Sequence, residues 1–219
     1  MEATAVIDPA LLSAYVASRI CHDLVSPVSS ITNALDMLDS PADAEMRQMS
    51  EDLLKDGARS ASTRLQFLRY AFGSVGLSDG AADIHEAKTL TENFVASHKP
   101  SISWDIETDH LSFSHVRLMM NLVMIGVESL PRGGVIHVRI RNEQSGMTIT
   151  VTAKGTRAKL REDTSAALAG KTPSGGWEPR NIQALFAKML SEGLGAELHA
   201  NEAGEEEIII MAQGVRAEG

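Results

Sequence analysis

Residues Ser18–Leu38 read SRICHDLVSPVSSITNALDML, and this stretch predicts a long helix with one apolar side. Its apolar residues recur at alternating spacings of four and three, the period of a helix that buries a narrow seam: Leu24, Val28, Ile31, Leu35 and Leu38. His22 comes two positions before Leu24, and roughly 200° of helical rotation turns its imidazole away from that seam. We therefore expect an exposed histidine on a helix whose opposite side is packed.

A second helix follows the first after a short turn. Asp8 and Pro9 are typical of a helix start, because the carboxylate accepts from free N–H groups and proline fits the first helical position. Residues 40–43, Ser-Pro-Ala-Asp, repeat this signal. The helix that they introduce has its own apolar seam: Met46, Met49, Leu53, Ala58, Ala61, Leu65, Leu68 and Phe72. We expect an antiparallel hairpin whose first helix bends at Pro27, which lacks the N–H that would bond to the carbonyl of Asp23.

Two helices cover only one side of each other, so the rest of their apolar surface needs another partner. A second copy of the hairpin can complete a dimeric four-helix bundle, and we favour this arrangement. The alternative is that the hairpin packs against the remainder of its own chain. The glycine-rich segment 73–80 marks a boundary. We expect a hairpin domain at residues 1–76 and a second domain at residues 77–219.

The second domain combines helical and strand patterns. Helical patterns cover 84–96, a stretch from a cap at Ser114 to Leu130, and 180–192, whose inward residues are Ile182, Leu185, Phe186, Met189 and Leu190. Alternating patterns typical of strands cover 101–107, 135–140, 147–152, 196–200 and 207–212. Segment 153–177 is irregular, with a weak helical signal at 166–168. Helices on one face of a mixed or antiparallel sheet define an α+β fold class.

The composition argues against several kinds of partner. A formal net charge of -9 disfavours nucleic acid or an anionic membrane as the main partner. No apolar run approaches the roughly 20 residues of a membrane-spanning helix, and no signal segment is recognisable at the N-terminus. The single cysteine, Cys21, excludes an intrachain disulfide. We expect a cytoplasmic protein.

The segment His22–Pro27, HDLVSP, resembles the H-box of bacterial two-component histidine kinases, in which His-Asp/Glu-Leu-x-x-Pro lies on the first helix of a dimerisation and phosphotransfer hairpin. The order of elements after the hairpin resembles the ATP-binding domain of those kinases, an α/β sandwich. The resemblance therefore covers nearly the whole chain.

The nucleotide-binding motifs of those kinases are altered in this sequence. In the segment 121–126, Ile125 stands where a kinase asparagine helps to hold magnesium, and an apolar side chain cannot ligate a hard cation. Ala153 aligns with the aspartate that recognises adenine. Thr172–Gly176 lacks the Gly-x-Gly-Leu-Gly pattern that presents amides to phosphates. We predict a degenerate domain that uses no ATP, binds no cofactor and holds no metal.

A kinase-like hairpin joined to such a domain resembles the histidine phosphotransferases of the ChpT type, which are dimeric relay proteins. That resemblance implies that His22 accepts a phosphoryl group from a receiver-domain aspartate of a hybrid histidine kinase and passes it to aspartates of response regulators. It implies that the second domain helps to dock the receivers. Magnesium is expected only in the receiver's own acidic pocket. Asp23 can reach the other ring nitrogen of His22 and fix its tautomer.

Helical geometry supplies further candidate site residues. Arg19 lies one turn before His22, and folding the hairpin near Pro41 brings Arg64 close to it. Either arginine can attract an acidic receiver and ease charge at the phosphoryl group, or simply be solvated. Residues after His22 are candidates for receiver docking, or plain solvent-facing positions: Ser26, Pro27, Ser29, Ser30, Asn33 and Met37.

Two other functions stay open. An ATP-dependent histidine kinase with an aberrant nucleotide site would label itself with ATP and magnesium, and a relay protein would not. A non-enzymatic adaptor that binds receivers would keep its function in the His22→Ala variant. The sequence does not indicate which receivers donate and accept, or the net direction of transfer.

Overall fold

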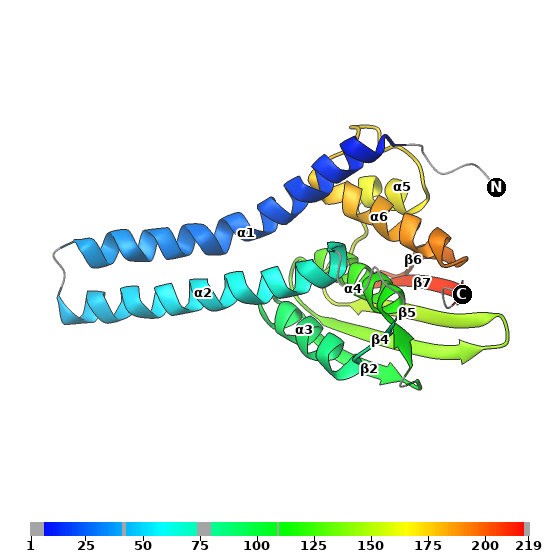
Figure 1. Ribbon diagram of the computed structural model, residues 1–219, viewed down its shortest axis with the longest axis horizontal. Coiled ribbons are helices and arrows are strands. Elements are labelled where there is room, and N and C mark those ends of the chain that lie inside the picture. The colour runs from blue at the N-terminus through cyan, green and yellow to red at the C-terminus, as the bar shows by residue number, and fades with distance from the viewer. Residues whose placement is uncertain (1–6, 41–42, 74–79, 109, 217–219) are drawn as a thin grey trace.

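A rod of two antiparallel helices projects from a rounded second domain in the computed structural model, which describes residues 7–40, 43–73, 80–108 and 110–216 (Figure 1). Helix α1 spans Pro9–Asp39 and α2 spans Ala44–Phe72. The N-cap of α1 is Asp8, as the sequence predicts, and that of α2 is Asp43, the last residue of the start signal at 40–43; both carboxylates accept backbone N–H groups of the first turn. The expected turn at 41–42 and most of the expected boundary, 74–79, lie outside the described residues.

A mixed five-stranded sheet forms one layer of the second domain, in the order β2-β4-β5-β7-β6. Strand β2 (Ser101–Ile106) runs parallel to β4 (Val135–Glu143). All other neighbours are antiparallel; these strands are β5 (Gly146–Lys154), β6 (Glu197–Gly204) and β7 (Glu207–Val215). The α+β class is confirmed. The sequence patterns did not predict the short pairing of β1 (Ala81–Ala82) with β3 (Leu111–Ser112).

Helices pack on one face of this sheet and enclose the core (Figure 1). They are α3 (Ile84–Ala96), α4 (Phe113–Glu128), α5 (Glu162–Leu168) and α6 (Pro179–Gly193). Alternate strand residues such as Ile136, Val138 and Val151 are fully buried. Every residue of α4 from 114 to 127 is buried, so this helix lies at the centre of the domain.

Three details differ from the sequence patterns. The N-cap of α4 is Ser112 and not Ser114, because Ser112 and His115 form a reciprocal capping box. Helix α5 is longer than the weak signal at 166–168. Met189 is 39% exposed rather than inward, because the buried side of α6 is centred on small residues, including Ala184 and Ala187.

The root of the hairpin is fixed to the second domain on two sides. The first part of α1 packs on α6, and the last part of α2 packs on α3 and α4 (Figure 1). The ring of Phe67 stacks on that of Phe94 with centroids 3.9 Å apart. The amide of Asn121 donates to the carbonyl of Ala71 at 2.9 Å. These contacts fix the end of α2 on α3 and α4.

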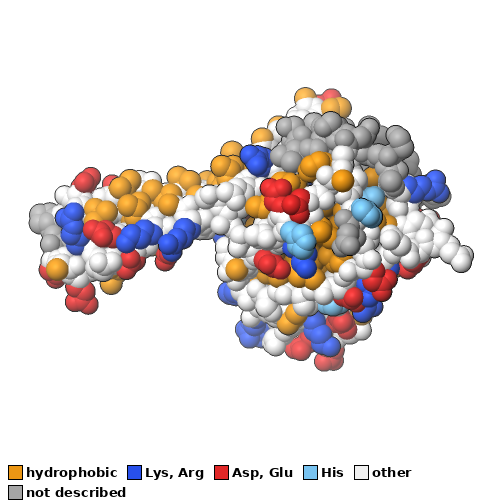
Figure 2. Space-filling model, turned by 60° about the horizontal axis from the view of Figure 1, so that its bottom comes forward, with side chains coloured by type: hydrophobic (Ala, Val, Ile, Leu, Met, Phe, Trp, Pro, Cys, Tyr) orange, Lys and Arg blue, Asp and Glu red, His pale blue; other side chains and the backbone are white. Residues whose placement is uncertain are grey.

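The far part of the hairpin exposes apolar side chains, which Figure 2 shows along one edge of the rod. Within the hairpin the helices approach closely because small residues lie between them, Ala34, Ser50 and Gly57. Of the predicted seam, Val28 and Leu35 remain about half exposed. Together with their neighbours they form what we call the apolar strip: Val25, Val28, Leu35, Met46, Met49 and Leu53. The chain thus packs the root of the hairpin on its own second domain and leaves the far part uncovered.

Candidate functional site

His22 lies at a cleft between α1 and the second domain. Its side chain is 56% exposed, as the helical pattern predicts. The cleft has a volume of about 700 Å³ and is lined by residues from both parts of the chain. Because the ring stands at the rim of a cleft and is open to solvent, a partner protein can reach it.

Asp23 fixes one side of the imidazole. Its Oδ1 lies 3.3 Å from Nδ1 of His22, and its side chain is only 12% exposed. An ionised carboxylate is only an acceptor, so Nδ1 carries the proton in this contact and Nε2 keeps its lone pair. The nitrogen that faces away from Asp23 is therefore the one with an available lone pair.

Arg19 is buried and ion-paired. It is therefore neither a solvated surface arginine nor one that reaches out to an acidic receiver, the two roles that its helical position suggested. Its Nε donates to Oδ2 of Asp23 at 3.1 Å, and its Nη2 donates to Oε1 of Glu128 on α4. Burial alone would lower the pKa of the guanidinium, but the charges of Glu128 and Asp23 outweigh it and raise the pKa. Arg19 therefore holds Asp23 and does not extend towards a partner.

Arg64 repairs the break in the helix ladder that Pro27 creates. Pro27 has no N–H for the carbonyl oxygen of Asp23, and Nη1 of Arg64 donates to that oxygen at 3.1 Å from α2. The hairpin thus brings Arg64 next to the H-box, as the reflection about the turn predicts. The guanidinium of Arg64 is thus bonded to the backbone of α1.

The candidate docking residues lie farther along α1 than the cleft. Ser26, Ser29 and Asn33 are exposed, while Ser30 and Met37 are partly buried. Pro27 is buried against α2, where a Cβ on Gly57 would come within 3.2 Å of its carbonyl oxygen. Pro27 is therefore not accessible as a docking contact, contrary to the sequence-based expectation. Its position bends and packs α1, which changes direction midway along its length (Figure 1).

The structure adds residues of the second domain to the site that no sequence motif indicated. Lys99, Arg161, Arg180 and Glu128 all line the cleft with His22. Lys99 donates to the carbonyl of Pro131 at 3.0 Å, and Arg161 is paired with Asp163. Arg180 is exposed, and no carboxylate among the described residues pairs with it. Arg180 and Lys99 therefore contribute positive charge to the lining of the cleft.

A second histidine, His98, also lines the cleft. Its Nδ1 lies 2.8 Å from the carbonyl oxygen of Phe94, which accepts the ring proton. Burial lowers the pKa of His98, and the bond to Phe94 offsets this only in part. His98 thus lines the cleft as a neutral ring that is held by its hydrogen bond to Phe94.

The positions that hold nucleotide in kinases are part of the hydrophobic core here. Ile125 is 1% exposed and Ala153 is fully buried. The side-chain amide of Asn121 donates to the backbone carbonyl groups of Ala71 and Arg117, and the backbone carbonyl of Asn121 accepts from Nε2 of Gln183. Within the described part of the chain, no group of three or more His, Cys, Asp or Glu residues could hold a metal. No helix among the described residues is long and apolar enough to span a membrane.

An exposed H-box histidine on a helical hairpin, followed by a domain of the kinase-ATPase type, defines a phosphotransfer protein of two-component signalling. The family model for the histidine phosphotransferase C-terminal domain matches residues 84–207. The chain is 31% identical over 202 residues to the protein phosphotransferase ChpT of Brucella abortus (strain 2308). This alignment covers 92% of this chain and 95% of that protein. The chain belongs to the histidine phosphotransferase family and acts as a phosphotransferase in a phosphorelay.

One solved structure supports this assignment. A structure described as a bacterial phosphotransferase superposes with a TM-score of 0.85 at 28% identity, covering 96% of this chain and 99% of that one. The histidine kinase AdeS of Acinetobacter baumannii superposes with a TM-score of 0.49 at 10% identity, over 90% of this chain and 98% of that one. We base no conclusion about activity on the latter similarity.

Proposed function

We propose that His22 carries the phosphoryl group in a relay between receiver domains. In the forward direction Nε2 takes the group from an aspartyl phosphate on the receiver of a hybrid histidine kinase and passes it to an aspartate of a response regulator. The observation that carries this proposal is the exposed His22 ring at the rim of the cleft, with Nδ1 turned to Asp23.

The transfer needs alignment more than a strong nucleophile, because phosphoryl transfer passes through a loose transition state. The lone pair of Nε2 forms the new N–P bond while the P–O bond to the receiver's aspartate breaks and its electron pair stays on that carboxylate. The ring, still protonated at Nδ1, becomes cationic, and Asp23 stabilises that charge. Transfer to the next receiver reverses these steps. Magnesium belongs to the receiver, whose acidic pocket binds the same phosphoryl group.

We propose that the reaction does not use ATP. Ile125 and Ala153 stand where kinases bind magnesium and adenine, and both are enclosed in the core. The side chain of Asn121 is engaged with two backbone carbonyl groups. A nucleotide at this place would have to displace packed side chains and break these bonds.

Receivers are proposed to dock across the cleft and along α1. The phosphorylation pocket of a receiver is acidic, and the exposed charge of Arg180, with Lys99 and Arg161 nearby, is complementary to it. The exposed Ser26, Ser29 and Asn33 extend this surface along the hairpin. In this arrangement the second domain shapes the docking surface, and the hairpin supplies the reacting group.

A homodimer is proposed because no described part of the chain covers the apolar strip. Its members recur at helical spacings on both α1 and α2, which fits the interior of a four-helix bundle formed by two hairpins. We keep the division into a hairpin at 1–76 and a degenerate domain at 77–219, and the family model that begins at residue 84 supports it. The proposed partners imply a cytoplasmic protein.

Mixing the protein with a phosphorylated receiver domain that carries labelled phosphate tests the proposal. Label is expected on the wild-type chain and absent from His22→Ala. Labelled ATP with magnesium, without a receiver, should leave the chain unlabelled, and labelling in that arm would favour a kinase. If His22→Ala still supports signalling between the two receivers, the chain is an adaptor and the relay proposal fails.

A further inference from the structure

A carboxylate of the second domain is connected to the reacting histidine through two ion pairs. Glu128, at the end of α4, accepts from Nη2 of Arg19. Nε of the same guanidinium donates to Oδ2 of Asp23 at 3.1 Å. The other oxygen of Asp23 lies 3.3 Å from Nδ1 of His22. The four side chains form an uninterrupted series from the second domain to the imidazole.

We propose that Glu128 is a positioning residue for His22, acting through Arg19 and Asp23. The inference rests on the proposed role of His22 as phosphoryl carrier and adds a residue to that site. In this arrangement the second domain influences the reacting nitrogen through these two side chains, in addition to shaping the surface on which receivers dock.

The geometry of the guanidinium makes this role specific. Arginine presents donors in a rigid planar fork, so one edge can face Asp23 while another faces Glu128. With Glu128 in place, Arg19 has a fixed orientation and occupies only one oxygen of Asp23. The second oxygen stays directed at Nδ1 of His22, which keeps the proton on that nitrogen and the lone pair on Nε2.

Burial and charge along the series support a positioning role. The exposed fractions of the side chains are 6% for Arg19, 12% for Asp23, 30% for Glu128 and 56% for His22. The two inner groups are therefore shielded from water, where ionic hydrogen bonds are strong and directional. Two carboxylates share one guanidinium, so Asp23 is not fully neutralised and remains a good acceptor for the ring proton.

A purely structural role for Glu128 is the competing explanation, because the Arg19–Glu128 pair also joins the hairpin to the second domain. Tyr70 provides a matched comparison. Its hydroxyl donates to Glu86 at 2.9 Å and also joins α2 to the second domain, without contact to the series. Tyr70→Phe therefore weakens the same junction and leaves the His22 environment intact. Glu143→Gln, on the exposed end of β4, controls for the loss of one negative charge.

The test compares the tautomer of His22 and the transfer kinetics in Glu128→Gln, Arg19→Lys, Tyr70→Phe and Glu143→Gln. Nitrogen-15 NMR of the full-length protein distinguishes a ring protonated at Nδ1 from one protonated at Nε2. We expect the Nδ1-protonated form to dominate in the wild type and to decline in Glu128→Gln, with kcat for phosphoryl acceptance about tenfold lower and KM unchanged. Arg19→Lys should act similarly, because a single ammonium group cannot reproduce the fork.

Both control variants should keep the wild-type tautomer and kcat, whatever their thermal stability. The inference is overturned if Glu128→Gln lowers stability as Tyr70→Phe does and leaves tautomer and kcat unchanged. If Glu128→Gln does not fold, Arg19→Lys decides by the same two measurements. The NMR measurement needs no phosphoryl donor, so it tests the positioning role independently of the relay function. A wild-type chain that takes no label refutes the proposed function alone.

Discussion

The far part of the hairpin and the interior of the second domain use similar apolar residues in opposite ways. On the hairpin, Val28 and Leu35 are about half exposed, although they follow the regular spacing of a buried seam. In the second domain, Ile125 and Ala153 are enclosed at positions where a kinase would keep an open polar pocket. The hairpin therefore leaves apolar surface exposed, whereas the second domain packs the positions that align with kinase ligand positions into its core.

The polar groups show the same division. His22 is accessible, with one ring nitrogen open to a partner. Asn121 and Gln183, at the centre of the second domain, are buried and bonded to the backbone. This division supports the proposal that the chemistry of this chain lies on the hairpin surface and that the second domain contributes by position.

The largest expected effect is on the apolar strip. Leu35→Glu places a charge in the proposed dimer interface twice, once per subunit, and should weaken dimerisation at least about 100-fold. Val135→Glu is the matched control, because Val135 is 45% exposed against 47% for Leu35 but lies on the sheet face opposite the helices. Sedimentation equilibrium over a range of concentrations gives both dissociation constants. Equal values for the two variants would show that the strip is not the interface.

The next effect concerns the core of the second domain. Ile125→Asn restores the kinase residue and should lower the free energy of unfolding by about 3 kcal/mol, because it removes a buried side chain and introduces an amide without partners. Urea unfolding measures this, and labelled ATP should still not label the variant. Met189→Asn, at a 39% exposed position of α6, should change stability by less than about 0.5 kcal/mol. If both substitutions changed the free energy of unfolding only slightly, Ile125 would lie in a pocket open to solvent and not in the core.

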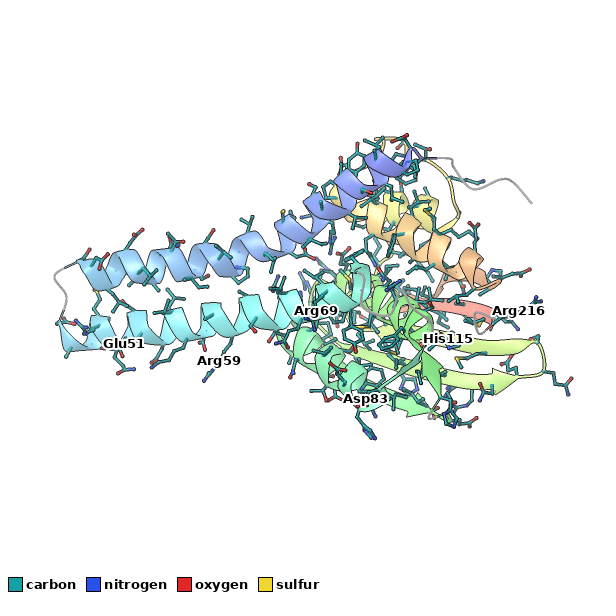
Figure 3. The ribbon with its side chains drawn as sticks, in the orientation of Figure 1. Glu51, Arg59, Arg69, Asp83, His115 and Arg216 are labelled. Atoms are coloured by element: carbon teal, nitrogen blue, oxygen red, sulfur yellow. The ribbon has the colours of Figure 1, made fainter. Side chains whose placement is uncertain are left out.

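A smaller effect is expected at the cleft. Arg180→Ala should raise KM for a phosphorylated receiver about threefold at low salt with little change in kcat, because a charge at the rim steers docking and does not touch the phosphoryl group. The difference should shrink as salt rises. Arg59→Ala serves as control, since Arg59 lies on the far part of α2 and points away from α1 (Figure 3). Equal effects of the two substitutions would reflect only the net charge of the chain.

A second effect on stability, smaller than that at Ile125, is expected at the junction of the two regions. Burial and the hydrogen bond to Glu86 raise the pKa of Tyr70 to about 12, so the folded state favours the neutral phenol. Its contribution is fully present below the unfolded pKa of about 10 and is lost as the pH rises through 12. The wild type should exceed Tyr70→Phe in stability by about 1 kcal/mol at pH 8, and this advantage should shrink between pH 10 and 12. Urea unfolding at several pH values measures it; a constant difference would contradict the assigned bond.

The sequence alone determined the features that depend on nearby residues. Capping and periodicity set the two long helices and turned His22 outward, because helical hydrogen bonds and faces repeat every few residues. The H-box predicted the family that the comparisons then showed. Substitutions at Ile125 and Ala153 indicated a degenerate pocket, since side-chain chemistry can be judged without coordinates.

Only the tertiary structure decided which side chains meet. Arg19 shares a helix face with His22, but the sequence could not show that Glu128, 109 positions later, would cover it and leave it buried. The same applies to Pro27, buried against Gly57, and to Arg180 at the cleft. A helical pattern gives the direction of a side chain relative to its own axis. What lies in that direction depends on how distant elements pack, and no local pattern contains that information.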